Sequence, residues 1–201
     1  KELVVASYQA ASGAGQPGID TLREQMSLVA GTNAGEVAGD VRKLVKDLGA
    51  FPAPLALNVI PWAGSLKEDG YTSEELKVRN ESRKILGMPK LKVSTTCVRV
   101  PVLTTHSLAV HATFKKEVTR KAAQKVLEKA AGVTLLDDPE NKKFPTPNDA
   151  VGTDATWVGR VRQSLDDKKS IDLFLCGDNL RKGAALNTAQ IAELLAVEFT
   201  A

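Results

Sequence analysis

The chain has 201 residues, of which 43% are hydrophobic and 25% are charged, so it can form one globular domain with a real core. Its 27 basic and 24 acidic residues are spread along the chain, and the net charge is only +3. We therefore expect no nucleic-acid partner, since no basic stripe is present. No apolar run approaches the roughly 18 residues that a membrane span needs.

The start of the chain does not resemble a signal peptide, so we expect a cytoplasmic protein with no membrane partner. Two cysteines, Cys97 and Cys176, are too few for a disulfide framework, and we expect both to be reduced. The chain enters an apolar run at Leu3 without an initiator Met. We expect it to be the back half of a longer protein.

In chain order, the first half predicts strands and helices separated by glycine and proline. Thr72 and Glu75 have the spacing of a capping box, in which the two residues satisfy each other's backbone amides at the start of a helix. The predicted elements are a strand at 3–10, a glycine-rich loop at 12–18, helices at 19–30 and 36–48, a short buried strand at 55–60 and a helix at 73–86.

The second half is richer in valine and threonine and predicts more strands. The predicted elements are strands at 93–103 and 108–114, a helix at 118–131, a strand at 133–136, a surface loop at 137–156, strands at 157–163 and 171–176, and a closing helix at 184–198. The first two of these strands are expected to be neighbours in a hairpin. This clustering indicates an α+β domain with a mixed, largely antiparallel sheet and helices packed on one face.

The glycines at positions 13, 15 and 18 match the spacing of a dinucleotide-binding loop, and Glu36 follows about twenty residues later. Pro17, however, removes a backbone donor near the helix entry, and no strand leads to Glu36. A tight glycine turn explains the same residues. Both interpretations stay open on the sequence alone.

The helix at 73–86 is unusually polar. Glu74, Lys77 and Glu81 fall on one face and carry both signs of charge. Such a face is either simply solvated or suited to a substrate that carries an anionic and a cationic group.

Alternation along the strand at 93–103 places Val98, Val100 and Val102 on one face and Cys97 and Arg99 on the other. If the valines face the core, Arg99 projects from the opposite face of a rigid strand. An arginine held in this way suits bidentate recognition of a carboxylate, and the alternative is a surface ion pair.

His106 and His111, the only histidines, point to opposite faces of a strand, so we expect no metal site. His106 lies at a strand junction, where it could transfer a proton or simply bond to the backbone. Cys97 and His106 could form a nucleophile pair, although a cysteine in such a strand is more often a small core residue. Cys176 is interpreted as buried packing.

Six segments, taken in order, resemble the C-terminal half of the aspartate-semialdehyde dehydrogenase family. They are SYQAASGAG (7–15), NVIP (58–61), YTSEELKVRNESRKIL (71–86), TCVRVPV (96–102), HS (106–107) and GDNLRKGAALNTAQIAELL (177–195). The resemblance implies the C-terminal α+β domain of a glyceraldehyde-phosphate-dehydrogenase-like protein. Residues 1–201 would form one substrate-binding and dimerisation domain, with the helix at about 184–198 packed toward an N-terminal NADP-binding domain.

The resemblance also implies an activity: NADPH-dependent reduction of aspartyl phosphate to aspartate semialdehyde with release of phosphate, in the biosynthesis of lysine, threonine, methionine and isoleucine. A cysteine would carry the acyl group as a thioester. The roles implied by the matching motifs are orientation of that intermediate for Gln9, substrate carboxylate binding for Arg99, amino-group binding for Glu74, phosphate binding for Lys77, acid/base catalysis for His106, and cofactor contacts for Ser12, Gly13 and Asn179.

One departure from the family is large, because its nucleophilic cysteine precedes the motif that contains Gln9 and would lie upstream of Lys1. We therefore expect the chain to be inactive alone. The resemblance also implies a homodimer formed through this domain. Two alternatives remain: a non-enzymatic homodimerisation module, and a domain of an N-acetylglutamyl-phosphate-type reductase.

Overall fold

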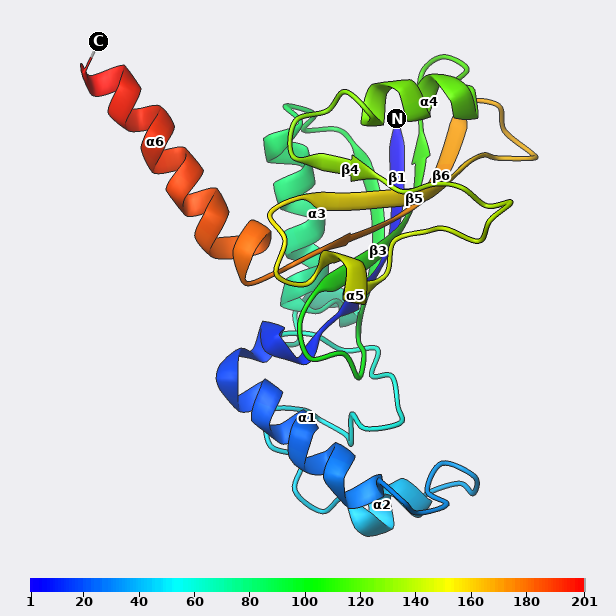
Figure 1. Ribbon diagram of the computed structural model, residues 1–201, viewed down its shortest axis with the longest axis vertical. Helices are drawn as coiled ribbons and strands as arrows, with labels where there is room; N and C mark the ends of the chain where they lie inside the picture. Colours follow the sequence, from blue (N-terminus) through cyan, green and yellow to red (C-terminus); the bar gives the residue numbers. More distant parts are fainter. Residues whose placement is uncertain (201) are drawn as a thin grey trace.

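The computed structural model describes residues 1–200. Its body is a six-stranded mixed sheet, and a lobe of helix and loop lies beyond one end of that sheet (Figure 1). The strand order is β2-β1-β3-β6-β5-β4, with parallel pairing only between β1 and β2 and between β4 and β5 in the described chain. The strands are β1 (Glu2–Gln9), β2 (Lys92–Arg99), β3 (His106–Thr113), β4 (Val133–Leu135), β5 (Thr156–Gln163) and β6 (Ser170–Gly177). The predicted α+β class with a largely antiparallel sheet is confirmed.

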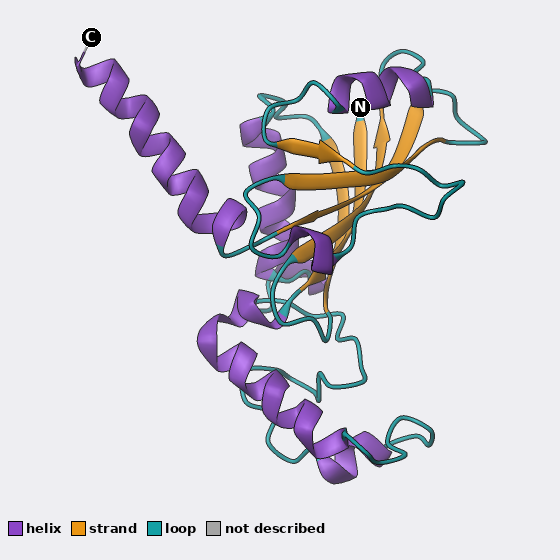
Figure 2. Ribbon diagram, in the orientation of Figure 1, coloured by secondary structure: helices purple, strands orange, loops and turns teal. Residues whose placement is uncertain are grey.

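Helices pack against parts of this sheet and build the second lobe (Figure 2). They are α1 (Gly15–Val29), α2 (Asp40–Leu44), α3 (Ser73–Ile85), α4 (Arg120–Leu127), α5 (Pro147–Ala150) and α6 (Leu186–Thr200), with short helical turns η1 (Ala11–Ala14), η2 (Glu68–Gly70) and η3 (Arg181–Ala185). The loop predicted at 137–156 thus contains α5. Within residues 1–200, no helix is both long and apolar enough to cross a bilayer.

The two faces of the sheet differ in how they are covered. On one face, Val158 and Ile171 pack against Leu127 of α4, while α3 lies along β2. On the other face, the side chains of Val4 and Tyr8 are 43% and 36% exposed. The described chain therefore leaves this face open around β1, whereas Ser107 and Cys176, which follow Tyr8 across the same face, are buried.

The predicted hairpin at 93–114 is wrong, because β1 lies between β2 and β3. The connecting residues do not turn directly back. Instead, the Val100 amide donates to the Gln9 carbonyl at 3.0 Å, and the Ala11 amide donates to the Val102 carbonyl at 2.8 Å. The connection therefore follows the end of β1 before the chain enters β3.

The loop predicted at 12–18 is also wrong, because η1 and the first turn of α1 occupy it. Pro17 is accepted there because the first amides of a helix have no partner inside it. The next strand begins only at Lys92, so Glu36 does not end a strand as a ribose-binding acid would. This geometry excludes a self-contained dinucleotide-binding unit at these glycines.

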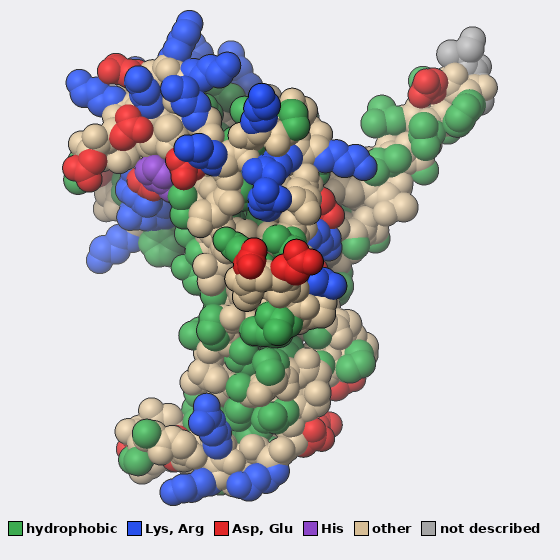
Figure 3. Space-filling model, turned by 180° about the vertical axis from the view of Figure 1, so that it is seen from behind, with side chains coloured by type: hydrophobic (Ala, Val, Ile, Leu, Met, Phe, Trp, Pro, Cys, Tyr) green, Lys and Arg blue, Asp and Glu red, His purple; other side chains and the backbone are tan. Residues whose placement is uncertain are grey.

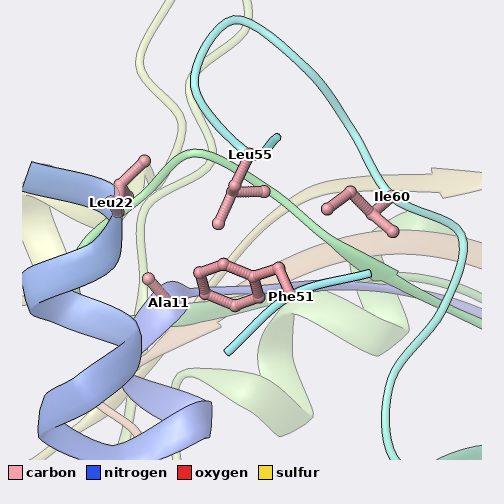
Figure 4. Packing of buried hydrophobic residues seen from close by; sticks show 5 residues of the cluster. All are labelled: Ala11, Leu22, Phe51, Leu55 and Ile60. Carbon is pink, nitrogen blue, oxygen red and sulfur yellow. The ribbon is translucent and has the colours of Figure 1, made fainter. Parts of the chain in front are cut away.

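Two further predictions in the lobe fail. The helix predicted at 36–48 shrinks to α2, since Gly39 takes a left-handed conformation and the Asp40 carboxylate accepts the amides of Gly35, Glu36 and Val37. The strand predicted at 55–60 is a turn whose ends, Leu55, Ala56 and Ile60, are buried while residues 57–59 are exposed. Its residues join a hydrophobic cluster (Figure 4) formed by Ala11, Leu22, Phe51, Leu55 and Ile60.

Candidate functional site

Gln9 and Arg99 lie directly opposite each other in the register of β1 and β2, at the ends of both strands. The predicted alternation on β2 is correct, but the burial is the reverse of the expectation. Arg99 is only 7% exposed and shares the helix-covered face with Cys97, whereas Val98 and Val100 are half-buried on the other side. Arg99 is thus part of the interior and not of a surface ion pair.

The backbone of Ala10 joins Arg99 to His106 through its amide and its carbonyl. Arg99 Nη1 donates to the Ala10 carbonyl at 2.7 Å, and the Ala10 amide donates to His106 Nδ1 at 3.0 Å. Because Nδ1 accepts this bond, the neutral imidazole carries its proton on Nε2. His106 is therefore presented as a hydrogen-bond donor.

Burial lowers the pKa of His106 from 6.5 to about 4, and the nearby positive charges of Arg99 and Lys77 add to this effect. The ring is consequently neutral at pH 7. The same interactions show that Lys77, which comes from α3, acts on the histidine at the start of β3.

The polar face of α3 reaches the same region. The capping box predicted from Thr72 and Glu75 is present, with both reciprocal bonds formed at the helix start. Lys77 Nζ lies 3.8 Å from Glu74 Oε1, and both side chains remain partly exposed. Burial lowers the pKa of Arg99, while the charge of Glu74 opposes that change. Four predicted residues, Glu74, Lys77, Arg99 and His106, are thus electrostatically coupled.

Gly13 lies beside this group and makes room for it. A Cβ atom at Gly13 would collide with Arg99 Nη1 and would lie 3.1 Å from His106 Nε2. The structure therefore gives Gly13 a packing role that its predicted cofactor role did not anticipate.

Ser12 and Asn179, the other two predicted cofactor residues, are in direct contact. Asn179 Oδ1 accepts from Ser12 Oγ at 3.0 Å and from the Thr105 amide at 2.9 Å. Thr105 is 1% exposed, has a positive φ of 90° and precedes His106 in the chain. Its Oγ1 has no hydrogen-bond partner within the described residues. Sequence reasoning missed Ala10, because its contribution comes from backbone groups that any residue carries. It also missed Thr105, because no local pattern indicates that the Oγ1 of this residue is buried.

Both cysteines are free and buried, and burial raises the pKa of each thiol. Reactive cysteines are usually partly exposed and have a lowered pKa. This environment argues against Cys97 as the nucleophile in a pair with His106. His111 lies apart from the site, with Nδ1 2.8 Å from Asp172 Oδ1, and residues 1–200 contain no cluster of three or more metal-binding side chains.

Comparisons with known proteins point to one family. The family model described as semialdehyde dehydrogenase, dimerisation domain, matches residues 1–182. The aspartate-semialdehyde dehydrogenase of Corynebacterium glutamicum is 51% identical over 198 residues, which are 96% of this chain and 56% of that protein. The corresponding protein of Mycolicibacterium smegmatis is 46% identical over 210 residues, covering 98% of this chain and 57% of its own length.

Solved structures agree with these relatives. Aspartate semialdehyde dehydrogenase II from Vibrio cholerae, complexed with ASA, has a TM-score of 0.88 and 36% identity, and the match covers 98% of this chain and 55% of that one. The chain thus spans about half the length of the relatives that it matches. It belongs to the semialdehyde dehydrogenase dimerisation-domain family.

Proposed function

We propose that this chain supplies the substrate-binding half of an enzyme that reduces L-aspartyl 4-phosphate to L-aspartate 4-semialdehyde with NADPH. The observation that supports this most strongly is the grouping of Arg99, His106, Glu74 and Lys77 around the ends of β1 and β2. These side chains match, in kind and in sign, the charged groups of an amino-acid acyl phosphate.

Three side chains bind the substrate in this proposal. Arg99 binds the α-carboxylate, because the Ala10 carbonyl engages one Nη1 donor and fixes the plane of the guanidinium. Glu74 binds the ammonium group, and Lys77 binds the phosphate. The 3.8 Å between Glu74 and Lys77 is short enough for the two to neutralise each other until a substrate with both charges arrives.

The covalent step uses a cysteine thiolate from outside this chain. The thiolate attacks the acyl carbon, the bond from that carbon to the phosphate oxygen breaks, and phosphate leaves with the electron pair. Gln9 orients the resulting thioester, held by its bond from Nε2 to Ser7 Oγ at 3.2 Å. Bound NADPH supplies the hydride that reduces the thioester carbon.

His106 acts on the acyl oxygen. Its Nε2–H donates a hydrogen bond to the oxygen that gains negative charge, and collapse of the adduct releases the aldehyde and the thiolate. The implied activation of the thiol by His106 would need a free acceptor at Nε2. That requires the opposite tautomer and loss of the bond from the Ala10 amide.

Ser12, Thr105 and Asn179 fit a contact with the cofactor. Thr105 Oγ1 is buried without a partner in the described chain, and it lies in the segment that Asn179 holds next to Ser12. A bound amide or hydroxyl group would satisfy this oxygen. Most of the cofactor would be held by the upstream half of the protein.

The proposal includes a homodimer formed through this domain and a contact between α6 and the upstream half. The family description supports the first part. For the second, α6 extends away from the body of the molecule, and hydrophobic side chains lie along it (Figures 1 and 3). Its most exposed apolar residues include Leu194 at 72% and Phe199 at 84%.

The test measures phosphate-dependent reduction of NADP by aspartate semialdehyde, with this chain and with a protein extended upstream. Turnover only by the longer protein is the expected result. Turnover by the short chain would assign the nucleophile to Cys97 or Cys176. A preference of the longer protein for N-acetylglutamate semialdehyde, or no turnover of either aldehyde, would overturn the proposed reaction.

A further inference from the structure

Helix α3 carries two of the proposed substrate ligands but has little apolar packing to fix its orientation. None of its residues belongs to the buried hydrophobic clusters of the described chain, and Glu75 is its only buried residue. A helix usually takes its rotation from an apolar stripe facing the core. Leu76 and Val78 are only half-buried, so we expect polar contacts to contribute strongly to the placement of α3.

Glu75 makes those contacts with both carboxylate oxygens. Oε2 accepts the Thr72 amide at 2.8 Å and closes the capping box, while Oε1 accepts the Cys97 amide at 3.2 Å. Since β2 is the edge strand, this Cys97 amide points away from β1 and is available to α3. One buried carboxylate thus joins the first turn of the helix to the strand.

The position of this bond on β2 matters for the site. Cys97 lies two residues before Arg99 on the same face of the strand, and Glu74 precedes Glu75 on the helix. Other bonds tie α3 to neighbouring loops, from Ser65 to Ser73 Oγ and from Arg83 to the Leu91 carbonyl. The Glu75 bond instead connects the helix to the strand that carries Arg99.

We propose that Glu75 is a positioning residue that holds Glu74 and Lys77 at the correct distance from Arg99. It touches no substrate itself. The inference rests on the proposed function for its kinetic consequence, whereas the bond from Glu75 to Cys97 can be tested without any substrate.

Two substitutions separate the helix cap from the bond to the strand. In α5, Thr146 and Asp149 form a capping box, which shows that aspartate can close one in this chain. Glu75→Asp therefore keeps the cap but withdraws the carboxylate from Cys97 by about 1.5 Å, one carbon–carbon bond. Thr72→Ala does the opposite, because it weakens the cap and leaves the bond to Cys97 in place.

The variants are compared in the longer protein that contains this chain. Glu75→Asp is expected to raise KM for aspartate semialdehyde about 10-fold with little change in kcat or in KM for NADP, because a charged hydrogen bond is lost. Thr72→Ala should leave that KM unchanged. Thr119→Ala, which removes the corresponding cap of α4 at the other end of the sheet, is the matched control.

Amide hydrogen exchange of the β2 segment gives a second measurement that needs no turnover. Exchange should rise in Glu75→Asp and stay at the wild-type level in Thr72→Ala and Thr119→Ala. If Glu75→Asp only lowers thermal stability, with KM and exchange unchanged, the positioning role is wrong. If wild-type protein shows no aldehyde turnover while exchange changes as expected, the proposed reaction fails and the bond itself stands.

Discussion

The smallest determinant of the site is the missing side chain at residue 13. Gly13→Ala would force Arg99 or the backbone to move, because the new methyl group would overlap Arg99 Nη1 and crowd His106. We expect kcat/KM of the longer protein to fall about 10- to 100-fold, the effect of about 1 to 3 kcal/mol of overpacking.

Gly177 provides the matched control for this substitution. It also lies at the end of a strand beside His106, but the nearest atom to an added Cβ is 4.0 Å away. Gly177→Ala should keep most of the activity. Equal losses in the two variants would show that the effect comes from disturbance of the sheet and not from Arg99.

The lowered pKa of His106 predicts how the free energy of unfolding changes at acid pH. Its pKa is lowered from 6.5 to about 4 in the folded chain, so between these values the unfolded chain binds more protons. Stability conferred by this neutral ring is therefore present above about pH 6.5 and is lost as the pH falls, by about 3 kcal/mol at pH 4.

Urea unfolding at pH 7 and pH 4 tests this value with His106→Gln as the reference. The variant has no titrating ring, so its free energy of unfolding should fall by about 3 kcal/mol less than that of the wild type. Identical losses in both proteins would show that His106 is protonated without cost, and that the Ala10 amide does not restrict Nδ1.

At the scale of elements, local signals predicted structure only where the chain needed no distant partner. The capping box at Thr72 and Glu75 lies within one turn, and α3 forms where it was predicted. The turn at 55–60 was misjudged because its amides are satisfied from thirty residues away, by a glutamine on α1. Strand order failed for the same reason, since nothing within 93–114 encodes the insertion of β1.

The residues of the site could be predicted from local motifs, but their contacts with distant parts of the chain could not. The charged residues could be named from their motifs, whereas the burial of Arg99 and the tautomer of His106 depend on the Ala10 backbone, which packs against them only in the fold. Glu75 was recognised as a cap because the capping partner is three residues away. Its bond to Cys97 spans 22 residues and left no local pattern.

At the scale of elements, we predict a loss of stability when Gln25, the glutamine on α1 that holds the turn at 55–60, is replaced. It is 1% exposed, its Oε1 accepts the amides of Leu55 and Ala56, and its Nε2 donates to the Asp47 carbonyl. Gln25→Ala leaves buried backbone groups without partners and opens a cavity, so the free energy of unfolding should fall by about 2 to 4 kcal/mol.

Denaturant unfolding measures this loss, with Gln16→Ala as control. Gln16 lies on the same helix, but it is exposed, and within the described residues its side chain bonds only to Asp20, one turn away. Its replacement should change stability by less than about 0.5 kcal/mol. If Gln25→Ala is equally mild, water replaces the side chain and the lobe does not depend on this residue.

At the scale of the whole molecule, two apolar surfaces remain uncovered by the described chain. One is α6, and the other is the open face of the sheet, where Tyr8 lies beside Phe174 with ring centroids 6.2 Å apart. The chain spans 56% of the length of its relative from Corynebacterium glutamicum, and we proposed above an upstream half that would contact part of this surface. We proposed above that α6 meets the upstream half, and we now assign the sheet face to the contact with a second copy of the chain.

Val4 tests the assignment of the sheet face. Its side chain is 43% exposed on the open face of β1. A lysine at this position would be solvated in the monomer, but its charged ammonium group would be buried without a partner in a dimer. Val4→Lys should weaken dimerisation of the longer protein at least about 100-fold, measured by sedimentation equilibrium. Leu165→Glu alters a side chain that is 100% exposed in the turn between β5 and β6, and should leave the dimer intact. If the dimer survives Val4→Lys but dissociates in a variant with charged residues on α6, then α6 forms the dimer contact and the assignment of the sheet face is wrong.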